Sequence, residues 1–154
     1  MVLVPGVPAL LPEYASLEDP VADLRAACRT AVERLGPRVR VVASAPSGGR
    51  VGAALVEASA GQVVDDGETG VLLVGNGSAK RTEKAPGHLD ERAEAFDAAL
   101  AAGLRGGTVA VDAALADELW ADVGALAAVD GLGAGEMLYD ATPFGVAYWV
   151  VGWR

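Results

Sequence analysis

The sequence predicts an α/β domain built from a mixed, mostly parallel sheet, flanking helices and a C-terminal antiparallel hairpin. Short apolar runs alternate along the chain with longer segments in which apolar residues recur at helical spacing, as in layered α/β proteins. One run, residues 70–74, is continuously apolar, which is typical of a strand covered by helices on both faces. The last two runs are separated by a tight connection and therefore predict the hairpin.

In the first half of the chain, residues 1–4 and 39–43 are predicted strands. Between them, Asp19 is expected to cap a helix that has Pro20 at its first position, where the missing N–H costs nothing. This helix should end at Gly36. Residues 46–49, with one proline and two glycines, predict a loop, and residues 51–60 favour a helix only weakly.

In the second half, a helix is expected to open at Asp90 and to end at Gly103. A third helix begins near Asp112, and its inward face is expected to hold Leu115, Leu119, Val123 and Leu126. Residues 131–135 form a glycine-rich joint, and residues 137–139 and 146–151 are the closing strands. The aromatic residues of the last strand should pack in the core, with Trp120 as a partner.

Composition and charge limit the classes of partner. A chain of 154 residues predicts one domain, 1–154, and a net charge of -9 repels nucleic acid. The single cysteine, Cys28, lies on the apolar face of a predicted helix and is expected to be a small buried side chain. The sequence shows no secretion signal and no membrane-spanning run, so a cytoplasmic location and no membrane partner are expected.

The polar loop after the strand at 70–74 is the best candidate ligand site, because ligands of open α/β sheets bind beyond the C-terminal ends of strands. Its glycines predict a nest of inward-facing backbone N–H groups, and its basic residues attract a carboxylate or phosphate. The alternative is a solvated turn whose basic residues pair with Glu83, Asp90 and Glu91. The predicted ligand-binding residues are Gly75, Asn76, Gly77, Ser78, Lys80 and Arg81, with Lys84 adding to the charge.

Two residues are weak candidates for acid/base catalysis. His88 is the only histidine, and its side chain titrates near neutral pH. It precedes a predicted helix, where a surface or capping role is the alternative. Asp140 follows a predicted strand and could orient a ligand, with capping of the next turn as its alternative.

Three stretches carry a resemblance to a known family: residues 4–13, residues 75–97 and residues 136–148. They resemble an actinobacterial family described as similar to the class III extradiol ring-cleavage dioxygenases. The resemblance covers both ends and the central loop, whereas residues 43–66 match poorly and look shortened. It implies the fold of the catalytic chain of protocatechuate-type ring-opening dioxygenases.

The same resemblance implies a metal site that this chain lacks the residues to build. Members of the dioxygenase family hold Fe(II) with two histidines and a glutamate, and a further histidine acts as acid and base. The first histidine belongs where this chain has Gly6, and the second belongs in the loop 43–49, which contains none. His88 matches neither position. No cofactor is therefore expected, and Fe(II) only if the family chemistry survives.

The leading hypothesis is an extradiol dioxygenase-like scaffold without iron-dependent ring cleavage. Such a protein would bind a small anionic ligand at the loop 75–84 or act as an accessory protein, and a homodimer also fits the small-residue surfaces. One alternative is an enzyme with different acid/base chemistry at this loop and His88. Another is a non-haem Fe(II) aromatic ring-cleavage dioxygenase, degenerate or active.

Overall fold

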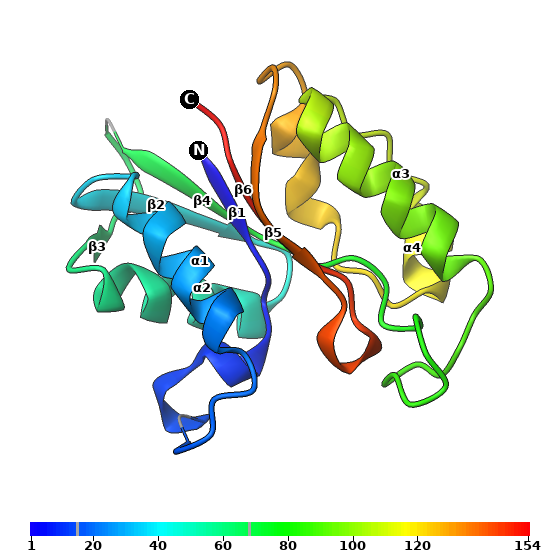
Figure 1. Cartoon of the computed structure of the whole chain (residues 1–154). Helices are drawn as coiled ribbons and strands as arrows, with labels where there is room; N and C mark the ends of the chain where they lie inside the picture. Colours follow the sequence, from blue (N-terminus) through cyan, green and yellow to red (C-terminus); the bar gives the residue numbers. More distant parts are fainter. Residues whose placement is uncertain (15, 68) are drawn as a thin grey trace.

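A computed structural model describes residues 1–14, 16–67 and 69–154 (Figure 1). One sheet contains six strands in the order β3-β2-β4-β1-β6-β5. The pairs β2–β3, β2–β4 and β1–β4 are parallel, whereas β1–β6 and β5–β6 are antiparallel. The fold class predicted from the sequence is therefore confirmed. The strands are β1 (Val2–Val4), β2 (Arg38–Ala43), β3 (Gln62–Val63), β4 (Gly70–Val74), β5 (Glu136–Ala141) and β6 (Tyr148–Gly152).

Helices cover the two faces of the sheet with two separate apolar clusters. One face carries α1 (Ala22–Glu33) and α2 (Pro46–Ala58), and the other carries α3 (Ala93–Gly106), α4 (Ala113–Glu118) and the 3-10 helix η3 (Gly124–Val129) (Figure 1). Successive side chains of a strand point to opposite faces of the sheet, so one strand can contribute to both clusters. In β4, Leu72 and Val74 face α1 and α2, and Leu73 faces α3. Among the residues described, no helix has the length and apolarity needed to cross a membrane.

The prediction that Asp19 caps α1, with Pro20 at the first helical position, is wrong, because Val21 is the N-cap residue. The helix begins at Ala22, and the Asp19 carboxylate still organises its first turn by accepting the N–H of Val21 at 3.1 Å and Nε of Arg25 at 2.7 Å. Cys28 is fully buried on the inner face of this helix, as expected. Burial raises the pKa of its thiol to about 12, so the thiol stays protonated at neutral pH.

The predicted loop at residues 46–49 is wrong, because this segment forms the first turn of α2. Tertiary packing explains the difference. A Cβ atom on Gly48 would lie 3.2 Å from Cγ1 of Val74, and one on Gly52 would lie 2.6 Å from Cγ1 of Val41. The glycines therefore let the helix sit close against the sheet, and this gain outweighs their low helix propensity.

The predicted long third helix is also wrong, because α4 ends at Glu118. Its end is a Schellman motif, in which the N–H of Ala121 bonds the carbonyl of Ala116 and the N–H of Trp120 bonds that of Asp117. The left-handed position of this motif, usually glycine, holds Trp120 with φ of 57°. Its side chain is 59% exposed, so the expected packing of Trp120 in the core is wrong as well.

The C-terminal hairpin has the predicted antiparallel pairing, with a register irregularity between Met137 and Tyr139. Trp149 and Trp153 are 1% and 5% exposed, so the prediction that they pack in the core is confirmed. The connection contains Phe144 at φ of 61°, a left-handed conformation that is costly for a large side chain. The antiparallel pairing of β5 and β6 places Asp140 directly opposite Trp149.

The strand order creates a topological switch point between β1 and β4. The chain leaves β1 through α1 towards β2, whereas it leaves β4 through α3 towards β5 on the other side. In open α/β sheets, ligands bind in the crevice beyond such a point. Here that place lies beyond Val4 and Val74, where the loop starting at Gly75 begins.

Candidate functional site

The segments that follow β1, β2 and β4 meet at the switch point, but they pack tightly together. The N–H of Gly6 donates to Oδ1 of Asn76 at 2.8 Å. A Cβ atom on Gly6 would lie 3.1 Å from Cγ1 of Val74 and 3.3 Å from Cα of Gly48. A histidine side chain at position 6 would therefore displace the start of α2.

This packing bears on the iron that the family resemblance implies. A side chain at position 6 would be in tight contact with Val74 and Gly48, and the second expected ligand segment leads into the start of α2 and is made of alanine, serine, proline and glycine. Within residues 1–14, 16–67 and 69–154, no group of three or more His, Cys, Asp or Glu side chains could hold a metal ion. The residues present at these positions do not fit Fe(II).

The loop after β4 does not form the predicted nest of backbone N–H groups, because the N–H groups of its two glycines, Gly75 and Gly77, already have protein acceptors. A Cβ atom on Gly75 would lie 2.6 Å from the carbonyl oxygen of Asp122, so this glycine permits close backbone approach. The prediction of a nest formed by the glycine N–H groups is therefore wrong. The pairs are Gly75 N to Val4 O, Asn76 N to Asp122 O, Gly77 N to Ala147 O, Ala79 N to Leu119 O and Arg81 N to Gly145 O, all at 2.9–3.0 Å.

A buried carboxylate on α3, Asp97, anchors this loop. Oδ1 of Asp97 accepts the N–H of Ser78 at 2.7 Å, and Oδ2 accepts the Ser78 hydroxyl at 2.6 Å. Nη1 of Arg81 also donates to Oδ2, at 3.3 Å. Ser78 is fully buried and Asp97 is 2% exposed, so the predicted ligand-binding role of Ser78 is replaced by a structural contact.

Burial raises the pKa of the Asp97 carboxyl, although the donors from Ser78 and Arg81 act in the opposite direction. Because the folded-state pKa is raised, protonation of this carboxyl adds to stability at pH values below the ordinary Asp value of 3.8, and this protonation-linked part is lost as the pH rises through the folded-state value. We therefore expect the free energy of unfolding of the wild type, minus that of Asp97→Asn, to decrease with rising pH. Urea titrations of both proteins between acid and neutral pH measure this difference. A difference that grows with pH would show a lowered pKa instead.

A pocket of about 280 Å³ lies beside this anchor, and it brings together two residues that the sequence singled out separately. Arg81 reaches it from the loop after β4, and Asp140 reaches it from β5. One face of α3 forms another wall, with residues three or four positions apart pointing the same way. That wall consists of Glu94, Asp97, Ala98, Ala101 and Arg105.

Asp140 is held from two sides within this pocket. Its Oδ1 accepts the indole N–H of Trp149 at 3.1 Å, and its Oδ2 accepts Nη2 of Arg105 at 2.6 Å. Both contacts fix the carboxylate in the pocket wall, in a β-strand, so it does not cap the turn. The sequence does not point to Arg105 and Asp97, because the apolar face of α3 dominates the pattern of this segment.

The two arginines of the pocket keep donors for a ligand. Arg81 is 23% exposed, and its second nitrogen lies 3.8 Å from Oε1 of Glu94, too far for a hydrogen bond. Arg105 directs one nitrogen to Asp140 and is 49% exposed. Each guanidinium carries five N–H groups, so several can bind an anion between them.

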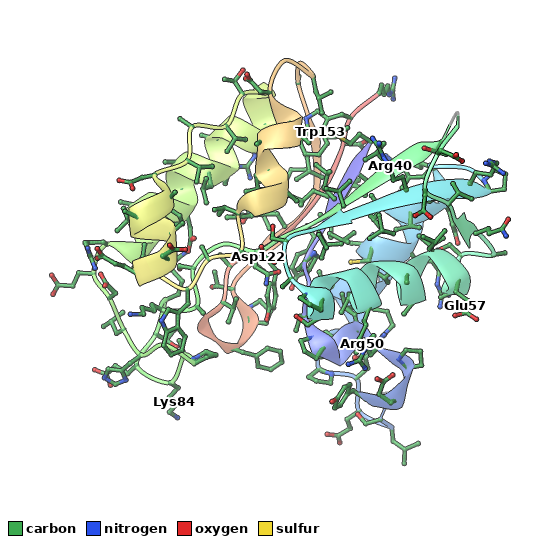
Figure 2. All side chains as sticks on the ribbon, turned by 180° about the vertical axis from the view of Figure 1, so that it is seen from behind. Arg40, Arg50, Glu57, Lys84, Asp122 and Trp153 are labelled. Atoms are coloured by element: carbon green, nitrogen blue, oxygen red, sulfur yellow. The ribbon has the colours of Figure 1, made fainter. Side chains whose placement is uncertain are left out.

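The other predicted residues lie outside the lining of this pocket. Nζ of Lys80 sits 5.4 Å from the ring centre of Trp120, in a cation–π contact. Lys84 projects from the loop at the opposite end of the sheet from Trp153 (Figure 2). His88 is exposed, and its backbone has a positive φ of 64°. Its Nδ1 lies 2.7 Å from the carbonyl oxygen of Glu83. Catalysis by His88 or Asp140 stays a prediction.

Comparison with known proteins gives no relative from which residue roles could be transferred. The resemblance to extradiol dioxygenases therefore stays a prediction, and the pocket geometry is the basis for assigning a function. No protein-family model, curated protein or solved structure matches this chain.

Proposed function

We propose that this protein is an extradiol dioxygenase-like scaffold that works without iron and binds a small anionic ligand between Arg81 and Arg105. The observation that carries the proposal is the pocket of about 280 Å³ in which both guanidinium groups keep free donors. Arginine pairs of this kind suit carboxylate and phosphate groups, because the planar donors match two acceptor oxygens.

The surroundings of the two arginines support a preorganised site. Arg81 is held by the buried Asp97, and Arg105 is held by Asp140, which Trp149 fixes in turn. Because these contacts exist before any ligand arrives, less side-chain entropy is lost on binding. The pocket volume is at or below the lower end for drug-sized ligands, so the ligand is a small molecule.

The proposal of an iron-independent function is supported by the packing at the switch point. Gly6 stands where the resemblance places the first histidine, and a Cβ atom there would crowd Val74 and Gly48. The anion pocket lies elsewhere, between the loop after β4, α3 and the hairpin. A ligand held there would be bound by protein side chains and would need no metal.

Arg105→Gln is expected to weaken anion binding by about tenfold or more, since a hydrogen bond to a charged group is worth about 1.5–3 kcal/mol. Titrations with butyrate and with inorganic phosphate, followed by NMR of the tryptophan indole N–H groups, measure the affinity. Trp149 should respond because it contacts Asp140 in the pocket. The variants Trp120→Phe and Trp153→Phe assign its signal by elimination.

Arg92→Gln is the matched control, because Arg92 is 53% exposed, forms ion pairs with Asp90 and Glu118, and lies outside this pocket. It should leave the affinities unchanged. The proposed function is wrong if neither anion perturbs Trp149, or if Arg105→Gln binds both as the wild type does. Stoichiometric iron in protein purified without oxygen would contradict the iron-independent part.

A further inference from the structure

Glu94 differs from Asp97 and Asp140, the other two acidic residues of the pocket, in its hydrogen bonding and its exposure. Both oxygens of Asp97 and both oxygens of Asp140 accept hydrogen bonds from fixed donors. Glu94 has a side chain that is 84% exposed, and its nearest cation is Nη2 of Arg81 at 3.8 Å. It is therefore a largely exposed negative charge in the pocket wall, and within the part of the chain that the structure describes no side chain donates a hydrogen bond to it.

The charges in the pocket set a limit on the ligand. Two guanidinium groups face three carboxylates, so the ionised pocket has one more negative than positive group before a ligand binds. A ligand with one carboxylate can bind between Arg81 and Arg105. Because both arginines of the pocket pair with the first carboxylate, a second negative charge on the ligand would lie unpaired and close to Glu94.

Beyond the charged residues, the pocket wall contains Thr142, which has a hydroxyl group, and four apolar side chains. Ala98 and Ala101 come from one face of α3, and Ala147 and the indole of Trp149 come from the hairpin. The apolar side chains suit methylene groups, whose burial is favourable, and the Thr142 hydroxyl brings no positive charge to a second anionic group. The volume of about 280 Å³ leaves room for a short body only.

From this arrangement we infer that the ligand is a small monocarboxylate with a short apolar body, and that Glu94 excludes dianions. The inference rests on the proposed function, since it needs an anion between Arg81 and Arg105. Glu94 is in this sense a specificity-determining residue, because it acts on the second charge of a competing ligand and contributes no donor to the first.

Butyrate and succinate test the inference directly, because they share a four-carbon chain and differ by one carboxylate. In the wild type, butyrate is expected to bind about five- to tenfold more tightly than succinate, as expected for one charge contact at about 4 Å in a dielectric close to that of water. Glu94→Gln should strengthen succinate binding more than butyrate binding and bring the ratio to about twofold or less. The shift of the Trp149 indole N–H reports both affinities.

Glu91→Gln is the control, because Glu91 is exposed, belongs to the turn before α3 and does not line the pocket. It removes the same charge from the protein and should leave the ratio at its wild-type value. Equal affinities in the wild type, or a ratio that Glu94→Gln leaves unchanged, overturn the inference and leave the proposed function in place. No response of Trp149 to either acid overturns both.

Discussion

Asp97→Ala is expected to lower the free energy of unfolding by about 3–5 kcal/mol, the cost of breaking a buried charged network from one side. The substitution leaves the N–H and hydroxyl of Ser78 buried without an acceptor, and it leaves the Arg81 guanidinium without its closest partner. Because the two Ser78 donors are shielded from water, they cannot replace the lost bonds with bonds to water. Urea unfolding at neutral pH measures the loss.

Two related variants separate this effect from a general loss of acidic residues. Ser78→Ala removes the hydroxyl donor alone and should cost about 1–2 kcal/mol. Glu94→Ala removes a carboxylate from the same helix face, but one that is 84% exposed, and should change stability by less than about 0.5 kcal/mol. If Asp97→Ala is as mild as Glu94→Ala, the carboxylate does not anchor the loop.

Gly77→Ala is expected to destabilise the fold by about 3 kcal/mol, at the upper end for overpacking a core. The new methyl group would lie 2.6 Å from Oδ1 of Asp97, 2.6 Å from Cη2 of Trp149 and 2.7 Å from Cβ of Ala147. None of these atoms is the end of a flexible side chain in open space. Gly77 is not among the described glycines with positive φ, so the cost comes from lost space and not from backbone strain.

Gly49→Ala serves as the opposite case within the same protein. This glycine lies in α2, and a Cβ atom there would meet nothing within 4 Å. The substitution should stabilise the protein by about 0.5–1 kcal/mol, because alanine restricts the unfolded chain and favours the helix. Thermal and urea unfolding of both variants give the comparison. A mild effect at position 77 would mean that the loop can move away from Trp149.

The layered fold could be predicted because most strands and helices carry the apolar pattern that their packing in the sheet layers requires. The continuous apolar run at residues 70–74 forms the central strand β4, buried on both faces. Prediction fails where tertiary packing overrides local preference. The glycines at 48 and 49 look like a loop until the distance of Gly48 from Val74 is known, and the spacing of leucines in the third helix hides the reversal at Trp120.

The candidate site could be predicted only in part. Charge and position after strands point to Arg81 and Asp140, yet nothing in the sequence shows that residues so far apart in the chain close into one pocket. The glycines of the loop suggest free N–H donors, whereas they allow close packing against Asp122 and Trp149. Asp97 and Arg105 are hidden in the sequence because the apolar face of their helix dominates its pattern.

The position of β1 in the middle of the sheet has a consequence for how the chain folds. This three-residue strand pairs with β4 on one side and with β6 on the other, and Met1 bonds Trp153 at a separation of 152 residues. The entropy of closing that long loop must be lost before the pairing stabilises anything. During synthesis, one edge of β1 therefore stays open until the last strand has left the ribosome, and a chain that stops before β6 exposes an apolar strand edge prone to aggregation.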